Sequence, residues 1–257
     1  MNPEEYAIMY HVEDRHWWYQ GMEQISRRLL EACCARSRPW RILDAGCGTG
    51  AASAGFLADY GRVTAFDLMA EALRFCRQRR LERLAQASVT ALPFAGQSFD
   101  LVASFDVLCE RSISDDRLPL NEFWRVLRPG GLLLLRLPAL DWLRGEHDEA
   151  VHIARRYTRQ QLHNRLQDAG FAVGRLAYAN TFLLPFVLSK RWADRLLAVL
   201  RPASRPVSDL TLPTGPLNPV LRAILAAEAR WVVRGSLPLG VSVFAVAQKA
   251  QAKERPA

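Results

Sequence analysis

Cysteines are few in this sequence, and their spacing does not suit a cross-linked fold. The 257 residues include five of them: Cys33, Cys34, Cys47, Cys76 and Cys109. The number is odd and no Cys-x-x-Cys pair occurs, which argues against a disulfide framework and against a zinc knuckle. Reduced thiols in the cytosol are the simplest interpretation.

Long apolar runs are also missing. The longest, such as Leu132–Leu135 and Phe182–Leu188, are far shorter than the roughly 20 residues of a membrane-spanning helix. The first residues include the acids Glu4 and Glu5 and lack the basic and then apolar pattern of a signal peptide. We therefore expect a cytoplasmic protein.

The chain does have apolar content and positive charge. Half of its residues are hydrophobic, which allows a sizeable core, and 257 residues are enough for one large α/β domain or two small ones. The formal charge is +8 and the isoelectric point is about 9.7. This balance suits nucleic acid or an anionic membrane face as a partner. A solvated basic surface also explains it, and on charge alone we prefer that interpretation.

A glycine-rich turn at residues 41–50 is the most informative stretch. Ile42 and Leu43 end a short apolar run typical of a buried strand, and a helix is expected to begin near Ala51. Glycines between strand and helix let a ligand approach bare backbone, and the helix start adds free N–H groups. The spacing is Gly-x-Gly-x-Gly after an aspartate, not the Gly-x-Gly-x-x-Gly of dinucleotide sites. The alternative is an ordinary tight turn.

A second acid follows the next predicted strand. Val63–Phe66 ends at Asp67, which comes 17 residues after Gly50. An acid at this point bonds the ribose hydroxyls in nucleotide-binding α/β folds. The alternative is a cap for the predicted helix Ala70–Arg80. After the glycine turn, we favour the ribose role.

Further motifs follow in order along residues 41–137. They are Leu-Pro-Phe at 92–94, Ser-Phe-Asp-Leu-Val at 98–102 and Arg-Val-Leu-Arg-Pro-Gly-Gly at 125–131. Together with Asp-x-Gly-x-Gly-x-Gly, they resemble the class I S-adenosylmethionine-dependent methyltransferases. The resemblance implies an α/β fold with a Rossmann-like, doubly wound, seven-stranded sheet whose last strand is reversed. From the sequence itself we expect strands at 87–89, 101–105 and 132–137.

The resemblance also assigns roles to residues. The cofactor S-adenosylmethionine would be bound by these: Asp44, Gly46, Cys47, Gly48 and Gly50 at the methionine end, Asp67 at the ribose, Leu68 and Val89 at the adenine, and Phe105 closing the site. Two positions depart from the family. Ser88 or Val89 stands where many members have an acid, and Glu110 stands where many have histidine.

The N-terminal segment carries aromatic residues in a row. His16 precedes Trp17, Trp18 and Tyr19, and a helix is predicted over about 22–34. This opening and the later stretch 146–158 resemble bacterial methyltransferases often found beside polysaccharide or lipid-linked sugar genes. The three aromatics are either a flap packed on the domain or a lid that contacts substrate, and both can hold.

Residues 138–157 follow the fifth predicted strand and so lie at the ligand-binding edge of such a sheet. His147 and His152 are five residues apart, a poor helical spacing for shared ligation, so we expect no metal site. The loop forms either a polar wall of the acceptor pocket, with His152 and Tyr157, or a solvated surface. If the acceptor needs a general base, Glu110 and His147 are the first candidates.

The C-terminal part completes the predicted division of the chain. We expect a lid at 1–38, the cofactor-binding core at 39–178, a helical insertion at 179–236, the last strand at 237–248 and a disordered tail at 249–257. Within the insertion, an apolar stripe around Trp192 opposes Lys190, Arg191 and Arg195. It either packs on a second helix at 218–234 or docks on the inner face of an anionic membrane.

Three functions compete on the sequence alone. The favoured one is methyl transfer to a small-molecule or lipid-linked acceptor. A nucleic-acid methyltransferase is the second, although no Asn-Pro-Pro-Tyr-like motif or catalytic Pro-Cys dipeptide occurs. The third is a cofactor-binding, membrane-docking module without catalysis.

Overall fold

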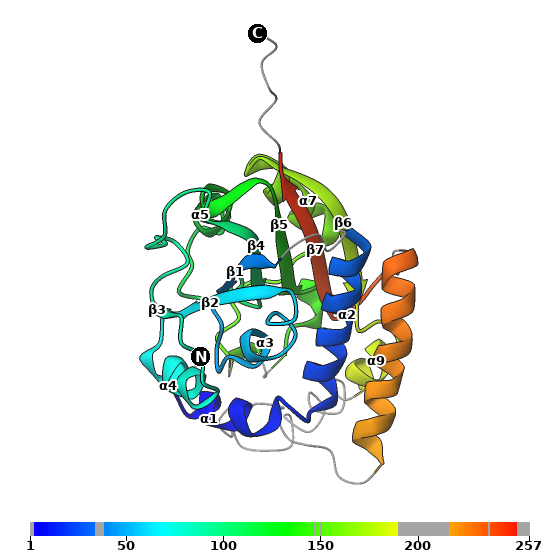
Figure 1. Cartoon of the computed structure of the whole chain (residues 1–257). Coiled ribbons are helices and arrows are strands. Elements are labelled where there is room, and N and C mark those ends of the chain that lie inside the picture. Colours follow the sequence, from blue (N-terminus) through cyan, green and yellow to red (C-terminus); the bar gives the residue numbers. More distant parts are fainter. Residues whose placement is uncertain are drawn as a thin grey trace.

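Seven strands form one sheet in the order β3-β2-β1-β4-β5-β7-β6 (Figure 1). The computed structural model describes residues 3–33, 39–145, 148–149, 151–189, 216–235 and 237–250. The strands are β1 Trp40–Ala45, β2 Gly61–Asp67, β3 Leu84–Gln86, β4 Phe99–Phe105, β5 Leu127–Pro138, β6 Phe171–Ala179 and β7 Ser242–Lys249. Strand β7 runs antiparallel to β5 and β6, and the other pairings are parallel. The predicted doubly wound sheet with a reversed last strand is confirmed.

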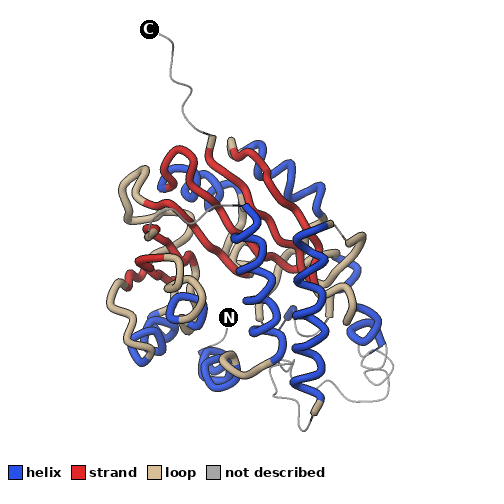
Figure 2. The backbone as a smooth tube through the Cα atoms, turned by 45° about the vertical axis from the view of Figure 1, so that its right-hand side comes forward, coloured by secondary structure: helices blue, strands red, loops and turns tan. Residues whose placement is uncertain are grey.

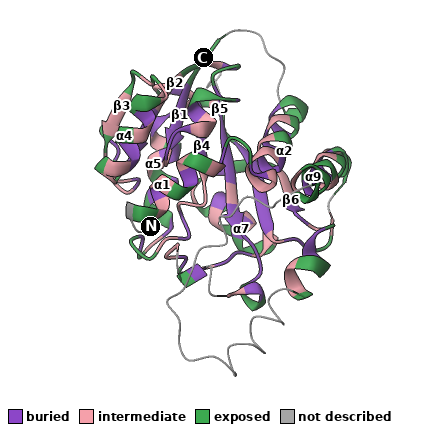
Figure 3. Cartoon of the chain, turned by 90° about the horizontal axis from the view of Figure 1, so that it is seen from below, coloured by how far each residue is buried: buried purple, intermediate pink, exposed green. Residues whose placement is uncertain are grey.

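Alternating side chains of the central strands build two cores, one on each face of the sheet. On β5, Leu133 and Leu135 join one buried cluster, and Leu132 and Leu134 join the other. The first is covered by α5 (Arg117–Val126) and α7 (Arg159–Asp168), and the second by α2 (Trp17–Cys33) and α9 (Leu217–Arg234). This is the continuous apolar pattern of strands buried on both faces. Figure 3 shows the buried strands between helices with exposed outer faces.

Helices α2 and α9 lie side by side although they come from opposite ends of the chain (Figure 1 and Figure 2). Their packing accounts for the apolar faces that the sequence predicted at about 22–34 and 218–234. The stripe around Trp192, together with residues 190–205, lies outside the described residues. No helix within the described ranges has the length and apolar character needed to cross a membrane.

Several boundaries differ from those predicted. Helix α3 covers Ala51–Ala54 instead of running to Tyr60, because the chain turns at Gly55 and buries Phe56 and Leu57. Strand β3 ends at Gln86 instead of spanning 87–89, because β2 ends opposite that residue.

Differences also occur at the ends of the chain. Helix α1 (Pro3–Val12) was not predicted, and α2 begins at Trp17, so the aromatic residues stand in its first turn. The predicted tail began at Lys249, but this residue closes β7. Its ammonium is buried and donates to the carbonyl oxygens of Trp124 and Leu127, each at 2.8 Å. Residues 251–257 lie outside the described part.

Candidate functional site

A cavity of about 1070 Å³ lies at the carboxyl edge of the sheet. The chain passes from β1 to β2 and β3 on one side and then returns to β4 on the other, so the order reverses between β1 and β4. Ligands of open α/β sheets bind at such a reversal. Residues at the strand ends that line the cavity include Asp44, Asp67, Phe105, Pro138, Asn180 and Ser242.

The glycine turn forms one wall. Gly46, Gly48 and Gly50 have φ angles of 75°, 55° and 85°, a left-handed backbone that favours glycine. Gly46 and Gly48 line the cavity together with Cys47. Gly50 instead faces the protein, since a Cβ there would stand 2.9 Å from the Cys76 Sγ. The predicted turn therefore exposes two of its three glycines to a ligand.

Asp44 lies behind this turn and is buried. Its Oδ2 accepts a hydrogen bond from the Ser53 hydroxyl at 2.6 Å. Burial raises the pKa of the carboxyl to about 7, against the opposing effect of that hydrogen bond. A cationic group entering the cavity would favour the ionised form of Asp44.

Asp67 joins the ends of β1 and β2. Its Oδ2 accepts from the Gly48 N–H and its Oδ1 from the Met69 N–H, both at 2.9 Å. The cap residue of α4 (Ala70–Gln78) is Met69, and no side-chain cap bond is found there, so the capping alternative does not describe this aspartate. Burial raises its pKa. A carboxylate has about four acceptor positions, so Asp67 keeps capacity for a further donor from the cavity.

The residues that the resemblance placed around an adenine also meet at this cavity. Val89 is buried in its wall, and Leu68 is 50% exposed at its rim. Phe105 closes the carboxyl end of β4 and lines the same space. These three apolar side chains thus line the same cavity as Asp67.

Helix α1 covers the glycine turn and was missed by sequence reasoning. Its Tyr6 and Met9 line the cavity. Burial raises the pKa of Tyr6, and the nearby carboxylates of Asp67 and Glu110 add to the effect. Its apolar and aromatic residues run without a break from Tyr6 to Tyr10 and so mark no single face, and periodicity therefore gave no signal.

Glu13 ties the segment after α1 to the core. It is buried, accepts from the Thr49 hydroxyl, and pairs with the Arg79 guanidinium at 2.8 Å. Arg79 also donates to the Thr49 carbonyl oxygen at 3.0 Å. The pair therefore links the N-terminal segment to both the glycine turn and the region that follows β2.

Trp17, Trp18 and Tyr19 all line the cavity. The Trp18 ring lies 4.7 Å from the Arg136 guanidinium, and the Phe105 ring lies 5.0 Å from it. Arg136 pairs with Asp106 at 2.6 Å, so its charge is held between two rings and a carboxylate. In the sequence, Arg136 is the one charged residue within the apolar run 132–137, and this was the signal that could have marked it as a site residue.

The candidate bases are placed differently. Glu110 lines the cavity, and burial raises the pKa of its carboxyl. His152 also lines it, with its imidazole pKa lowered first by burial. His147 lies outside the described residues.

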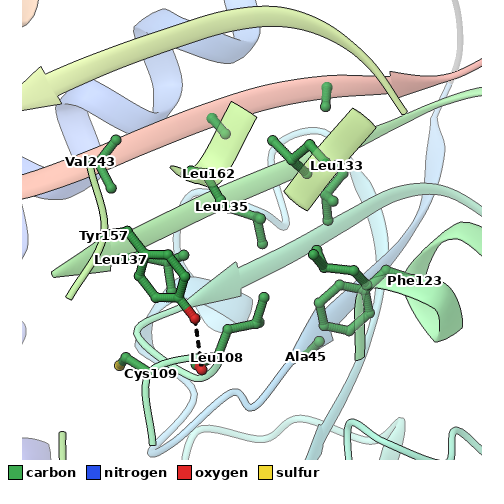
Figure 4. Packing of buried hydrophobic residues seen from close by; sticks show 14 of the residues in the cluster. Ala45, Leu108, Cys109, Phe123, Leu133, Leu135, Leu137, Tyr157, Leu162 and Val243 are labelled. Carbon is green, nitrogen blue, oxygen red and sulfur yellow. Dashed lines mark hydrogen bonds between the residues drawn. The ribbon is translucent and has the colours of Figure 1, made fainter. Parts of the chain in front are cut away.

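Tyr157 is not among the residues that line this cavity, so its predicted contact with substrate stays a prediction that the geometry does not support. Its ring is buried in the core, and its hydroxyl lies 3.2 Å from the Leu108 carbonyl oxygen (Figure 4). The Asp116 Oδ2 lies 3.0 Å from the same hydroxyl, so these two acceptors share its one proton. These two partners occupy the phenol hydroxyl, the one polar group of the side chain. Tyr157 therefore stabilises the base of the loop.

Known proteins with similar sequences are methyltransferases. A sequence family described as a methyltransferase domain matches residues 43–135. A malonyl-[acyl-carrier protein] O-methyltransferase of Enterobacter lignolyticus is 35% identical over 159 residues, which are 58% of this chain and 62% of that protein. A ubiquinone/menaquinone biosynthesis C-methyltransferase of Serratia proteamaculans is 32% identical over 126 residues, covering 45% of this chain and 49% of that protein. The chain thus spans between about half and three fifths of the length of these two curated relatives.

Solved structures share the fold at low sequence identity. An S-adenosylmethionine-dependent methyltransferase from Thermotoga maritima superposes with a TM-score of 0.60 at 15% identity, covering 96% of this chain and 95% of its own. A phosphoethanolamine N-methyltransferase from Haemonchus contortus gives a TM-score of 0.54 at 17% identity, covering 88% of this chain and 52% of its own. These likenesses extend the shared architecture beyond residues 43–135.

Proposed function

We propose that this chain, in which residues 43–135 are a methyltransferase domain of the class I, Rossmann-like type, transfers a methyl group from S-adenosylmethionine to a small-molecule or lipid-linked acceptor. One observation carries the proposal. The left-handed glycines after β1 and the carboxylate after β2 meet at 2.9 Å on the wall of a single large cavity.

The residues of this wall fit the proposed cofactor. When bound, S-adenosylmethionine supplies an electrophilic methyl group on a sulfonium. Asp67 would accept hydrogen bonds from the ribose hydroxyls, and the backbone of Gly46 and Gly48 would hold the methionine part. Leu68 and Val89 would flank the adenine. A volume of about 1070 Å³ exceeds the roughly 300–1,000 Å³ of ordinary ligand sites, so an acceptor has space in the same cavity.

Glu110 is the proposed general base. Its carboxyl lines the cavity and has a raised pKa, so it takes a proton from a hydroxyl or ammonium acceptor more readily than an exposed glutamate does. The remaining contribution is alignment, because holding acceptor and methyl group in line supplies most of the rate in such a displacement. His147 stays a proposal, since it lies outside the described residues.

The aromatic side chains that line the cavity support a small-molecule or lipid-linked acceptor. Trp17, Trp18 and Tyr19 line the cavity, and we propose that they close over the bound acceptor and cofactor. The two curated relatives are named for a malonylated carrier protein and for quinones, which are not nucleic acids. Salt-sensitive binding to nucleic acid would favour the second candidate function instead.

Contact with a membrane is proposed as a separate property of the chain. Phe182 and Phe186 are exposed, and in the sequence they come shortly before the basic residues of the predicted helix. Flotation with anionic vesicles at low salt should carry the protein upward, and K190E/R191E/R195E should stay at the bottom. A wild-type protein that also stays at the bottom contradicts docking.

The enzymatic proposal is tested by turnover. Labelled S-adenosylmethionine is incubated with the protein and fractionated cell extract, and the labelled product is identified by mass spectrometry. Transfer into one low-molecular-weight or lipid fraction is expected. Calorimetric binding of S-adenosylmethionine without transfer to any fraction would instead favour the non-catalytic module.

A further inference from the structure

Arg136 brings a positive charge to the wall of the cavity. The residue lies near the end of β5 and lines the cavity, and its side chain is 12% exposed. The guanidinium carbon lies 4.7 Å from the centre of the Trp18 ring and 5.0 Å from that of the Phe105 ring. Trp18 and Phe105 line the same cavity, so the charged end of the arginine lies among groups that border it.

Asp106 occupies only part of this guanidinium. Its Oδ2 accepts from the Arg136 Nε at 2.8 Å and lies 2.6 Å from the Nη2. An arginine has five N–H donors in a planar fork, and within the described part of the chain the Arg136 Nη1 has no acceptor. The edge formed by Nη1 and Nη2 can therefore bind one further acceptor in a bidentate pair.

The surroundings of Arg136 hold this edge in position. The Asp106 N–H donates to the Arg136 carbonyl oxygen at 2.8 Å, so the same residue is bonded to the backbone and to the side chain of the arginine. The contacts with the Trp18 and Phe105 rings further restrict rotation of the guanidinium. A planar fork that is already oriented loses little conformational freedom when it binds a ligand.

Arg136 is separated from the cofactor half of the site. Strand β5 is three strands away from β2 in the sheet, which at about 4.8 Å per strand places the two strands roughly 14 Å apart. Asp67 ends β2 and is the residue assigned to the ribose. A group bound at Arg136 therefore leaves that position free for the cofactor.

Apolar side chains line the cavity on the other side of β5. Strand β7 pairs directly with β5, and Arg136 is in register with Phe244. The segments between β6 and β7 contribute these cavity residues: Phe186, Val187, Leu217, Leu221 and Val241. Leu221 is buried, whereas Phe186 is 50% exposed, so this apolar lining continues from the interior toward solvent. It suits a hydrocarbon chain attached to a group that Arg136 binds.

We propose that Arg136 determines acceptor specificity by binding the anionic head group, a carboxylate or a phosphate, of an amphiphilic acceptor whose hydrocarbon part lies along this apolar lining. The inference rests on the proposed function and names its substrate class. An anion is the matching group because a guanidinium is positively charged and offers donors only. Hydrogen bonds between two charged groups are roughly twice as strong as neutral ones, which favours an anion over an ester or an alcohol.

The probes are octanoate, octyl phosphate and the neutral methyl octanoate. Each is titrated by calorimetry into the full chain saturated with S-adenosylhomocysteine. The wild-type protein should bind at least one of the two anions about tenfold or more tightly than the ester. The tighter anion identifies the head group as a carboxylate or a phosphate. Removing two methylenes from it should weaken binding about tenfold, because the chain then buries less apolar surface.

Two variants test Arg136 itself. R136Q/D106N removes both charges of the pair, so no buried charge is left alone, and it should bind the anions and the ester about equally. R136K keeps the charge without the planar fork and should retain only part of the preference. The matched control is R117Q/D115N, which removes an exposed Arg–Asp pair that does not line the cavity and should behave as wild type.

Three results would overturn the inference: equal affinity of anions and ester for the wild-type protein, no measurable binding of either anion, or a full preference in both R136Q/D106N and R136K. Affinity for S-adenosylmethionine is measured on the same samples. A wild-type protein that does not bind it contradicts the proposed function. Normal cofactor affinity without an anion preference contradicts the role of Arg136 alone.

Discussion

Gly21 of α2 lies against Leu225 of α9 so closely that a Cβ at Gly21 would stand 2.3 Å from the Leu225 Cδ1. Both residues are buried, and the contact lies within the core that covers one face of the sheet. Because the two helices come from opposite ends of the chain, this contact sets how closely the N-terminal helix α2 approaches the helix α9 that precedes β7.

Adding a side chain at this contact should destabilise the fold. Gly21→Val forces α2 and α9 apart, and we expect the free energy of unfolding to fall by about 1–3 kcal/mol. Urea denaturation of G21V, L225A and the double variant forms a cycle in which the two changes should couple by about 1 kcal/mol or more. G235A is the control, since no atom lies within 4 Å of its new Cβ. Strict additivity would contradict a direct contact.

The glycine turn and Asp67 should control cofactor affinity separately. Asp67→Ala removes hydrogen bonds to a carboxylate, so affinity for S-adenosylmethionine should fall about 10- to 100-fold. Gly46→Ala should weaken it further, because the residue has a φ of 75° and its Cβ would stand 2.3 Å from Val107. Calorimetry measures both variants. Unchanged affinity for S-adenosylmethionine in both variants would show that the glycine turn and Asp67 do not bind the cofactor.

Arg79 should hold the N-terminal segment closed. Arg79→Ala removes the partner of buried Glu13, so α1 should open more often and cleavage by trypsin after Arg15 should accelerate several-fold. S-adenosylhomocysteine should slow that cleavage in the wild-type protein. Arg74→Ala changes an exposed arginine of α4, the helix that ends just before Arg79, and serves as the control. Equal cleavage rates for the two variants would show that the Arg79–Glu13 pair does not hold the N-terminal segment in place.

Asp44 should make stability depend on pH. Its folded pKa of about 7 exceeds the ordinary value of 3.8, so the folded protein keeps a proton that the unfolded chain releases. The free energy of unfolding should therefore fall as pH rises from about 4 to 7, by up to about 4 kcal/mol, and then level off. Urea denaturation of ligand-free D44N should show a smaller decline. D141N, at an exposed site, should keep the wild-type slope.

Glu110→Gln should separate catalysis from binding once the acceptor is identified. The variant keeps the size of the side chain and loses the proton-accepting carboxylate, so turnover of a hydroxyl or amine acceptor should fall about 10²- to 10⁴-fold. Affinity for S-adenosylmethionine should stay within a factor of two or three. A thiol or carboxylate acceptor needs little help from a base, and undiminished turnover would therefore remove Glu110 from the mechanism.

The cofactor half of the site was predictable because its residues directly follow strands. Asp44 and Asp67 stand at the ends of β1 and β2, and parallel strands bring their carboxyl ends to one edge. The position of each aspartate at the end of a predicted strand was therefore enough to predict that the two lie at the same edge of the sheet. The roles of Leu68, Val89 and Phe105 came from the family resemblance instead, and the structure places all three residues on the wall of the same cavity.

The covering elements were not predictable in this way. Glu13 meets Arg79 across 66 positions, and neither residue belongs to a repeating pattern. The hydroxyl of Tyr157 is used by Asp116, 41 positions earlier, so a tyrosine in a ligand-side loop proved to be a core residue. Such contacts depend on tertiary packing, which single-sequence periodicity does not encode.

The antiparallel course of β7 has an evolutionary consequence. Strand β6 ends and β7 begins at the same edge of the sheet, so the chain between them leaves and returns beside the cavity. Recombination or insertion within this connection would therefore exchange the wall opposite the glycine turn while β1 and β2 keep their sequence. A lineage could acquire a new acceptor by replacing one continuous segment, provided that a helix still packs on α2.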